Sequence, residues 1–562
     1  MRIALKIAAI GLAAGLGACA SVKDAAPPVP DHASEYANYI SARFAAVQFD
    51  LKGASHYYSD SLKADPANKD LLRSAFFFAS ASGDIDEAAR LAQLVVAQTP
   101  NDSDARLTLA VVALRKHDFA GARAQINQSD TGPFAAMMTA LVDGWAAAGI
   151  GDKPGAIADM TKLRAQGGAE QLAMLHLALV SDYLGDAEIA EMAYRATLTS
   201  GGTPRVIDAY GRFLERAGRT RDATDFYTKF SADGALRAIT GAGLARLKAG
   251  AKPDRMVPRA EDGVAEALFT VAAAQTDQAS ALAAIHYLRL ALYLRPGLDL
   301  GAVLLADRLE NLQKYDDAIA VYATVDKASP YWRMAQVEMA LDEARVKRSD
   351  AAIAHLKALT ADQPDDAEAW IALGDTYRST DKFAEATAAY DRAVALRDAS
   401  KSADWQLYFA RAVSEQGTKN WDAAEADLQK ALALSPAEPT LLNYLGYTWV
   451  DQNRNIAQAL AMLEKAHTLK PTDGYIADSV GWAYYKLGRY ADAAKALQVA
   501  VELVPGDPTI NDHLGDAYWR TGRKLEAQFQ WNHALAFGPA DADKAVIEKK
   551  LKDGLDDGAK SN

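Results

Sequence analysis

Small residues recur along this chain at a nearly constant spacing, each near the start of the second helix of a predicted helix pair. The first series runs in steps of 34 residues with a last step of 33, and comprises Ala54, Ala88, Ala122, Ala156, Ala190 and Ala223. After a gap of 61 residues come Ala284, Ala318, Ala352, Ala386, Ala424, Ala459, Ala493 and Ala527, again in steps of 34 except for 38 and 35 around Ala424. A period of this length predicts fourteen stacked helix pairs.

Prolines mark the ends of the same units. One stands twelve residues beyond nine of these marker alanines, at Pro66, Pro100, Pro296, Pro330, Pro364, Pro436, Pro471, Pro505 and Pro539. Because proline cannot continue a helix, each of them is expected to close its unit.

The later units carry further marks at fixed offsets. These are Trp370, Leu373, Gly374, Tyr377, Ala386, Tyr390 and Ala393; then Val480, Gly481, Tyr484, Ala493, Leu497, Ala500 and Pro505; then Leu514, Gly515, Tyr518, Ala527, Trp531, Ala534 and Pro539. The pattern resembles the tetratricopeptide repeat (TPR) family. The resemblance implies an all-α fold, a TPR α-solenoid of antiparallel helix pairs that is stabilised by stacking. The first six units match the pattern less closely.

Glycines and bulky residues have opposite roles in such a unit. Gly374, Gly481 and Gly515 are expected where two helices approach closely. Tyr390, Leu497 and Trp531 are expected to fill the space between successive pairs.

The gap between Ala223 and Ala284 is too short for two regular units. Its segment A-G-A-K-P-D-R-M-V-P-R-A-E-D-G has the prolines and glycines of a loop. We therefore predict two arms: a degenerate N-terminal TPR arm at 36–250 and a C-terminal TPR arm at 264–540, with a loop at 251–263. Residues 541–562 are predicted to form a polar capping helix and a tail.

The N-terminus has the pattern of an export signal. Arg2 and Lys6 precede 12 apolar residues, from Ile7 to Ala18. A spanning helix needs roughly 20 apolar residues, so we interpret residues 1–18 as a signal peptide.

The signal ends in Leu16-Gly17-Ala18-Cys19, which resembles the bacterial lipobox, and Cys19 is the one cysteine of the chain. The resemblance implies cleavage before Cys19, attachment of acyl chains, and, with Ala20 next, sorting to the periplasmic face of the outer membrane. Residues 19–35, with Pro27, Pro28 and Pro30, are predicted to be a flexible tether. A plain secretory signal with an incidental cysteine is the alternative.

Composition argues against several classes of function. The net charge of −12 and the lack of a basic run disfavour nucleic acid. The nine histidines form no metal-binding spacing such as H-E-x-x-H. We therefore expect no metal site, no cofactor, no catalytic residue and no small-molecule substrate. Asp512, His513 and Asp516 could suggest an acid–base site, but we interpret them as polar residues of a binding solenoid.

The family's concave positions, carried onto the last units, select a row of candidate binding residues. The row is Asn443, Tyr447, Tyr475, Asp478, Trp482, Tyr485, Lys486, Asp512, Asp516, Trp519 and Arg520. Large aromatic residues beside polar anchors are typical of binding hot spots. Asp478 and Asp512 replace the lysine or asparagine of the family's carboxylate clamp, which favours an extended apolar, aromatic or basic peptide. Ordinary solenoid surface is the alternative.

Three C-terminal segments are similar to a group of proteobacterial TPR proteins. They are L-N-Y-L-G-Y-T-W-V-D-Q-N, D-S-V-G-W-A-Y-Y-K-L-G-R-Y and I-N-D-H-L-G-D-A-Y-W-R-T-G-R. That group includes lipoproteins that act as adaptors for periplasmic C-terminal-processing proteases. The resemblance implies a membrane-tethered scaffold whose partners are other proteins. A factor for outer-membrane assembly or polysaccharide secretion is the alternative, and an enzyme is a third interpretation.

Overall fold

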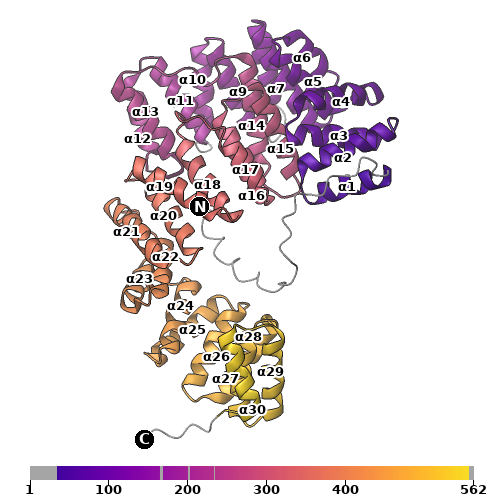
Figure 1. Cartoon of the computed structure of the whole chain (residues 1–562). Helices are drawn as coiled ribbons and strands as arrows, with labels where there is room; N and C mark the ends of the chain where they lie inside the picture. Colours follow the sequence, from indigo (N-terminus) through magenta and orange to yellow (C-terminus); the bar gives the residue numbers. More distant parts are fainter. Residues whose placement is uncertain (1–34, 165–168, 200–202, 233, 556–562) are drawn as a thin grey trace. The chain divides into compact units, whose positions relative to one another are not determined.

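The computed structural model describes residues 35–164, 169–199, 203–232 and 234–555. Within these ranges the chain forms α-helices and one short 3-10 helix, η3 (Gly234–Leu236), and no β-strand. Consecutive helices pack on each other in pairs (Figure 1). The predicted all-α solenoid is thereby confirmed. The signal peptide, Cys19 and most of the tether lie outside the described residues.

The chain divides into two compact units between Ala352 and Ile353. The N-terminal unit contains α1 (Glu35–Val47), α2 (Leu51–Ala64), α3 (Lys69–Ser82), α4 (Ile85–Gln98), α5 (Ser103–Arg115), α6 (Phe119–Ile126), α7 (Pro133–Gly149), α8 (Lys153–Arg164), α9 (Glu170–Tyr183), α10 (Ala187–Leu198), α11 (Pro204–Arg216), α12 (Thr220–Phe230), α13 (Arg237–Ala249), α14 (Ala260–Ala274), α15 (Ala281–Leu294), α16 (Asp299–Asn311), α17 (Tyr315–Tyr322) and α18 (Trp332–Arg345). The boundary falls within α19 (Ser349–Asp362).

The C-terminal unit continues with the same pairing. It contains α20 (Ala367–Arg378), α21 (Phe383–Ala399), α22 (Trp405–Gly417), α23 (Trp421–Leu434), α24 (Pro439–Asp451), α25 (Ile456–Leu469), α26 (Gly474–Lys486), α27 (Tyr490–Leu503), α28 (Pro508–Arg520), α29 (Lys524–Ala536) and α30 (Asp541–Asp553). α30 spans the segment for which the sequence predicts a capping helix.

Each of the fourteen marker alanines is the fourth residue of the second helix of its pair, and each is buried. The nine prolines lie in the connections that follow these helices. A methyl group at this position lets the first helix pack closely on the second. The predicted pairs are therefore confirmed.

The three predicted close approaches are also present. A Cβ atom built on Gly374 would lie 2.5 Å from the ring of Tyr390, and one on Gly515 would lie 2.4 Å from Trp531. The corresponding contact of Gly481 is with Leu497, at 2.5 Å. Because a real Cβ cannot approach so closely, glycine is required if these bulky side chains are to fill the space between pairs.

The interior of the N-terminal unit is filled by a later part of the same unit. α14 packs on α7 and α9, and α15 packs on α3 and α5 (Figure 1). Every residue of α14 from Ala260 to Phe269 is buried. A helix that is buried on all sides must be covered by several elements, and here these are its own partner α15 and the first helices α7 and α9 of earlier pairs.

This packing changes the predicted domain boundary. The irregular segment covers only 251–259, because α14 begins at Ala260 and includes Gly263. The contacts of α14 and α15 join this region to the N-terminal unit, and the units separate about ninety residues later, after Ala352. In place of a separation between two arms, the gap in the repeat contains the unpaired helix α13, which packs on α11 and α12.

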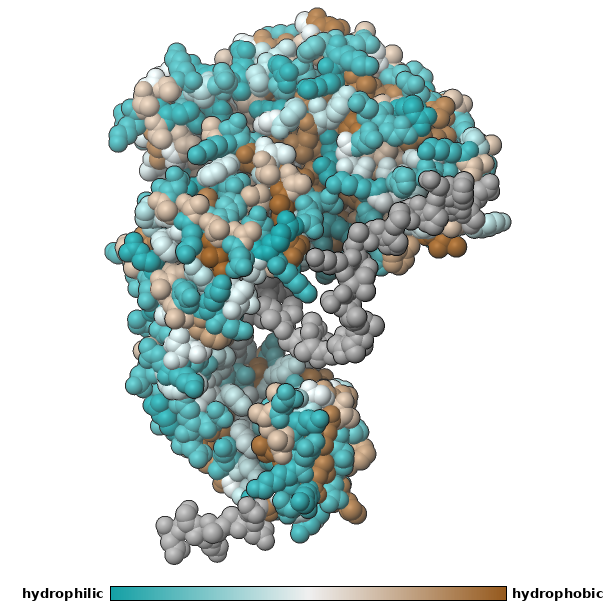
Figure 2. Space-filling view, in the orientation of Figure 1, coloured by the Kyte–Doolittle hydropathy of each residue, from teal (hydrophilic) through white to brown (hydrophobic). Residues whose placement is uncertain are grey.

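Most of the surface visible in Figure 2 is hydrophilic, with hydrophobic residues in small groups between hydrophilic ones. Among the described helices, none combines the length and the apolar character that crossing a bilayer requires.

Candidate protein-binding groove

The predicted binding row lies on three neighbouring first helices of the C-terminal unit. α26 packs on both α24 and α28. Asp473 begins α26 by accepting the backbone N–H groups of Tyr475 and Ile476, and Asp507 begins α28 in the same way. Such caps each stabilise a helix by about 1 kcal/mol. These caps fix the first residue of α26 and of α28, and they thereby fix the positions of the row residues that follow on each helix.

Two rings of the row, those of Trp482 and Tyr485, form a stack together with the ring of His513. The rings of Trp482 and Tyr485 are parallel within 5°, with centroids 4.7 Å apart. The imidazole of His513 also stacks on Trp482, with ring centroids 3.9 Å apart and an interplanar angle of 12°. Trp482 and Tyr485 are only half-buried, so their remaining surface is available to a ligand.

His513 is held in this stack by a carboxylate from the preceding first helix. Its Nδ1 lies 2.9 Å from Oδ1 of Asp478, and both side chains are buried. Burial by itself lowers the pKa of His513, but the charge and hydrogen bond of Asp478 outweigh it and raise the pKa above its ordinary value. The pair therefore orients the ring that supports Trp482.

Two cations border the stack. Nζ of Lys486 lies 5.3 Å from the centroid of Trp482, within the range of a cation–π contact. Arg520 donates from Nε to the hydroxyl of Tyr485 at 3.4 Å. Both cations hold aromatic rings in place, which keeps the row ordered.

The remaining open positions lie on α24 and at the start of α26. Tyr475 is exposed, whereas Tyr447 and Asn443 are half-buried. Burial, with the charges of Asp451 and Asp478, raises the pKa of Tyr447 to about 12. The carboxamide oxygen of Asn443 is buried and has no hydrogen-bond partner among the described residues. It is therefore an acceptor that a bound backbone N–H could satisfy.

The row on α28 is different, because α30 covers it. Nζ of Lys550 binds Asp512 at 2.7 Å and Asp516 at 2.9 Å. The ring of Trp519 lies against Gly554, where a Cβ would approach within 2.1 Å. Asp512, Asp516 and Trp519 thus face the capping helix and do not extend the open row. The family's concave positions alone could not reveal this, because the helix lies beyond the last repeat.

Asp516 also connects α28 to the core of its own pair. It accepts a hydrogen bond from Nε1 of Trp531 at 3.0 Å, and Trp531 is fully buried. Burial raises the pKa of Asp516, although Lys550 opposes that shift. Both oxygens of the Asp516 carboxylate are therefore used in contacts that stabilise the fold.

The N-terminal unit contains a counterpart of the stacked pair. Trp145 and His176 are 31 residues apart, as are Trp482 and His513, and they occupy the same positions relative to their marker alanines. Nε1 of Trp145 donates to Nδ1 of His176 at 3.0 Å. Both side chains are fully buried, and burial lowers the pKa of His176 to about 3. A Cβ on Gly263 of α14 would lie 2.1 Å from the Trp145 ring.

Sequence reasoning missed two residues of this site. The sequence analysis interprets His513 only as a polar residue of a binding solenoid, whereas its buried ring completes the stack. Lys550 lies beyond the last repeat, and no sequence pattern identifies it as a residue of the site. Within the described ranges, no group of three or more histidine, cysteine, aspartate or glutamate side chains is arranged to hold a metal ion.

Comparison with protein families identifies the repeats in both units. A TPR-repeat model matches residues 481–522, and tetratricopeptide-repeat models match 337–403, 409–474 and 79–130. Among curated proteins, the chain is 35% identical over 95 residues to TPR repeat-containing protein PA4667 of Pseudomonas aeruginosa, covering 17% of this chain. It is 31% identical over 143 residues, or 25% of this chain, to the cytochrome c-type biogenesis protein CycH of the same organism. These matches span 16% and 34% of the relatives' own lengths.

Solved structures give similar matches. The crystal structure of the APC/C hetero-tetramer Cut9-Hcn1 has 16% identity and a TM-score of 0.38, covering 93% of this chain and 96% of that one. YrrB, described as a TPR protein with an unusual peptide-binding site, has 21% identity and a TM-score of 0.28, covering 35% of this chain and 98% of its own. The family models, together with the fourteen helix pairs, show that both units are built from tetratricopeptide repeats.

Proposed function

We propose that the chain is a scaffold that binds segments of other proteins along α24 and α26. The observation that carries the proposal is the difference between two equivalent tryptophans. Trp145 is fully buried and is covered by α14 of its own chain, whereas Trp482 is only half-buried. A preorganised aromatic surface of this kind is typical of a binding hot spot.

The chemistry of the row favours one class of ligand. Asp478 is paired with His513 and Asp512 with Lys550, so neither position offers a donor to a terminal carboxylate. Trp482, Tyr485 and Tyr475 offer apolar and π surface, and Asn443 offers a buried acceptor. An extended segment with apolar, aromatic or basic side chains and free backbone N–H groups fits this row.

We further propose that acyl chains on Cys19 hold this scaffold on the periplasmic face of the outer membrane. The lipobox-like sequence before Cys19 and Ala20 after it support this location. The adaptor-like segments in the C-terminal unit favour an envelope enzyme as partner, such as a C-terminal-processing protease together with its substrates. In this role the scaffold raises the local concentration of enzyme and substrate and performs no chemistry itself.

An assembly or secretion factor for outer-membrane or exported-polysaccharide machinery is the second candidate. The partial match to a protein named for cytochrome c-type biogenesis supports a role in biogenesis. Both candidates use the same row, so the identity of the bound protein separates them.

The test is affinity capture from solubilised envelopes with three forms of the chain. The wild type is compared with Trp482→Ala and with Trp421→Ala, which removes an exposed tryptophan on α23, outside the row. The proposal expects a protease or its substrates to be captured by the wild type and Trp421→Ala, and to be lost with Trp482→Ala. Capture of assembly or export components instead favours the second candidate, and equal capture by all three forms contradicts the proposed row.

A further inference from the structure

α1 presents an apolar face that no other described residue covers. Tyr36 is 80% exposed, Ile40 65%, Phe44 67% and Val47 67%. Spacings of three and four residues place these side chains on one side of the helix. Scattered apolar residues are normal on a surface, but a contiguous group on one helix indicates a contact.

The later units show why this face is open. Phe44 lies ten residues before its marker alanine, and the residues at the same position in later first helices include Phe78, Phe213 and Trp449. All three are buried, with 8%, 6% and 4% exposed. A preceding pair stands beside each of them, but none precedes α1 in the described part of the chain. Since α30 closes the other end of the repeat array, the two ends are built differently.

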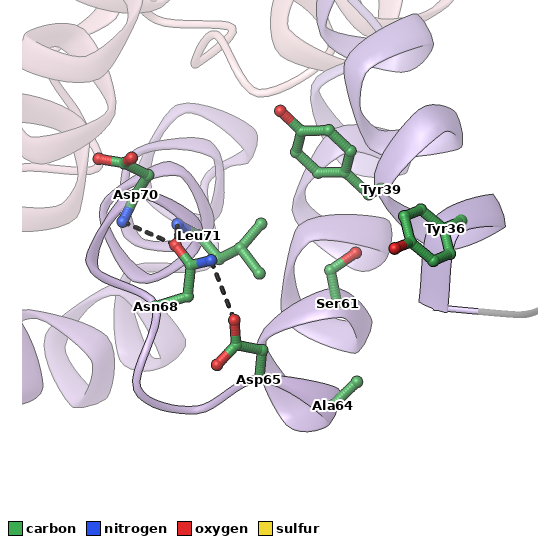
Figure 3. Close-up of a pocket in the computed structure, with 8 residues that line it drawn as sticks. All are labelled: Tyr36, Tyr39, Ser61, Ala64, Asp65, Asn68, Asp70 and Leu71. Carbon is green, nitrogen blue, oxygen red and sulfur yellow. Dashed lines mark hydrogen bonds between the residues drawn. The ribbon is translucent and has the colours of Figure 1, made fainter.

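A hollow of about 270 Å³ adjoins this face (Figure 3). Tyr36 and Tyr39 line one side, and Asn68 and Leu71 line the other. Tyrosine combines an apolar ring with a polar hydroxyl and is favoured where an apolar phase meets water. The exposed guanidinium of Arg43 lies on the same helix, with Nη1 3.4 Å from the hydroxyl of Tyr39. The border of the apolar face on α1 is therefore polar, and it carries a cation that suits an anionic lipid headgroup.

We propose that the α1 face, formed by Tyr36, Ile40, Phe44 and Val47, rests on the lipid surface of the membrane. The inference rests on the proposed anchor at Cys19. Only residues 20–34 separate that cysteine from α1. A chain of this length reaches at most about 55 Å, so the lipid is always close to the face. With α1 against the bilayer, the solenoid is attached at its N-terminal end and the binding row is left to other proteins.

The size of the face argues against a second copy of the chain as its cover. With about 150–250 Å² for an aromatic side chain, the face presents on the order of 600 Å². Stable protein–protein interfaces bury roughly 800 Å² from each partner, including a polar rim. A membrane surface has no such minimum area, because binding there scales with the apolar area buried and with the attraction of cations to anionic headgroups.

The test uses the chain from Ala20 onward, which lacks the anchor but keeps every described residue. Flotation with vesicles of phosphatidylethanolamine and phosphatidylglycerol measures the bound fraction. The double change Ile40→Ser and Phe44→Ser should reduce binding by about fivefold or more, since it removes two large apolar side chains. The matched control is Leu94→Ser, because Leu94 is 45% exposed on α4, outside the face.

A second readout locates the contact. The chain from Ala20 has no cysteine, so Ile40→Cys or Leu94→Cys attaches an environment-sensitive dye at one site. The proposal expects vesicles to shift the emission of the dye at position 40 to the blue and to leave that at position 94 unchanged. No vesicle binding by the wild type, equal binding by the double variant, or a dimer by light scattering that the double variant abolishes would each overturn it. Trp482→Ala must retain vesicle binding, which separates this test from that of the binding row.

Discussion

Trp145 and Trp482 stand at equivalent positions of their repeats, each eleven residues before a marker alanine, yet only Trp145 is fully buried. Gly263 of α14 lies directly against the Trp145 ring. In the C-terminal unit the same position belongs to a stack of three rings, of which Trp482 and Tyr485 are only half-buried. One repeat position therefore serves the core in one unit and a candidate binding surface in the other.

The contact between Gly263 and Trp145 should tolerate no added side chain. We expect Gly263→Ala to lower the free energy of unfolding of the chain by roughly 1–3 kcal/mol, because the new methyl group overlaps the indole. Urea denaturation followed by circular dichroism measures this effect. Gly241→Ala on α13 is the control, since a Cβ there meets nothing within 4 Å. The control should be neutral or stabilising by up to about 1 kcal/mol, as expected for alanine in a helix.

Trp482 and Trp519 should respond differently to truncation, although the sequence places them in one row. Trp519→Ala removes the ring that packs against Gly554, so α30 should open more often. Hydrogen exchange of the α30 amides is expected to accelerate in this variant and to remain slow in Trp482→Ala. Equal acceleration in both variants would mean that the stack on α26 also supports the capping helix.

The repeat itself could be predicted from the sequence because each unit obeys the same local requirement. An alanine at a close helix crossing, a glycine opposite a bulky ring and a proline at the end of a unit are visible as fixed offsets. The fourteen marker alanines accordingly fall at one helical position in all pairs. Contacts of this kind join residues that are within about forty positions of each other in the chain. A periodic sequence pattern therefore reveals them.

Contacts between distant units could not be predicted in this way. The segment before α14 has prolines and glycines that are typical of a loop, and the pattern does not show that Gly263 belongs to a helix lying on α7. The role of Lys550 is hidden for a similar reason. It is 34 residues from Asp516, which is one repeat period, but it follows the last repeat, so the repeat pattern assigns it no position. The repeat pattern is the same in the part of the predicted row that stays open and in the part that α30 covers. Only the tertiary structure distinguishes the two parts.

The Asp478–His513 pair should make the C-terminal unit more stable at mildly acidic pH than at alkaline pH. Since the native pKa of His513 is raised, its contribution is complete below the unfolded value of about 6.5. It is lost as the pH rises through the native pKa. Asp478→Asn removes the charge that most raises the pKa of His513 and leaves only the smaller effects of Asp512 and Asp516 against burial. The pKa of His513 should therefore fall. We expect Asp478→Asn to destabilise the chain more at about pH 6 than at about pH 9, measured by urea denaturation. An equal loss at both values would show that the histidine is neutral throughout.

Lys550 should be the residue on which the attachment of α30 most depends. Its ammonium group neutralises Asp512 and Asp516 together, and all three side chains are largely buried. Lys550→Met keeps the length of the side chain but leaves two carboxylates without a cation. Removing one partner of a buried ion pair costs roughly 3–5 kcal/mol, and the exposed edge of this cluster should reduce that loss somewhat.

The loss of stability in Lys550→Met is expected to come from the two carboxylates that no longer have a cation beside them. A second substitution distinguishes this cause from a loss of packing. Adding Asp512→Asn to Lys550→Met removes one uncompensated charge and should recover part of the lost free energy of unfolding. Lowering the pH should recover stability in the single variant as well, because Asp516, whose pKa burial already raises, then binds a proton. If neither the second substitution nor acid restores stability, the loss arises from the packing of the lysine stem against α28.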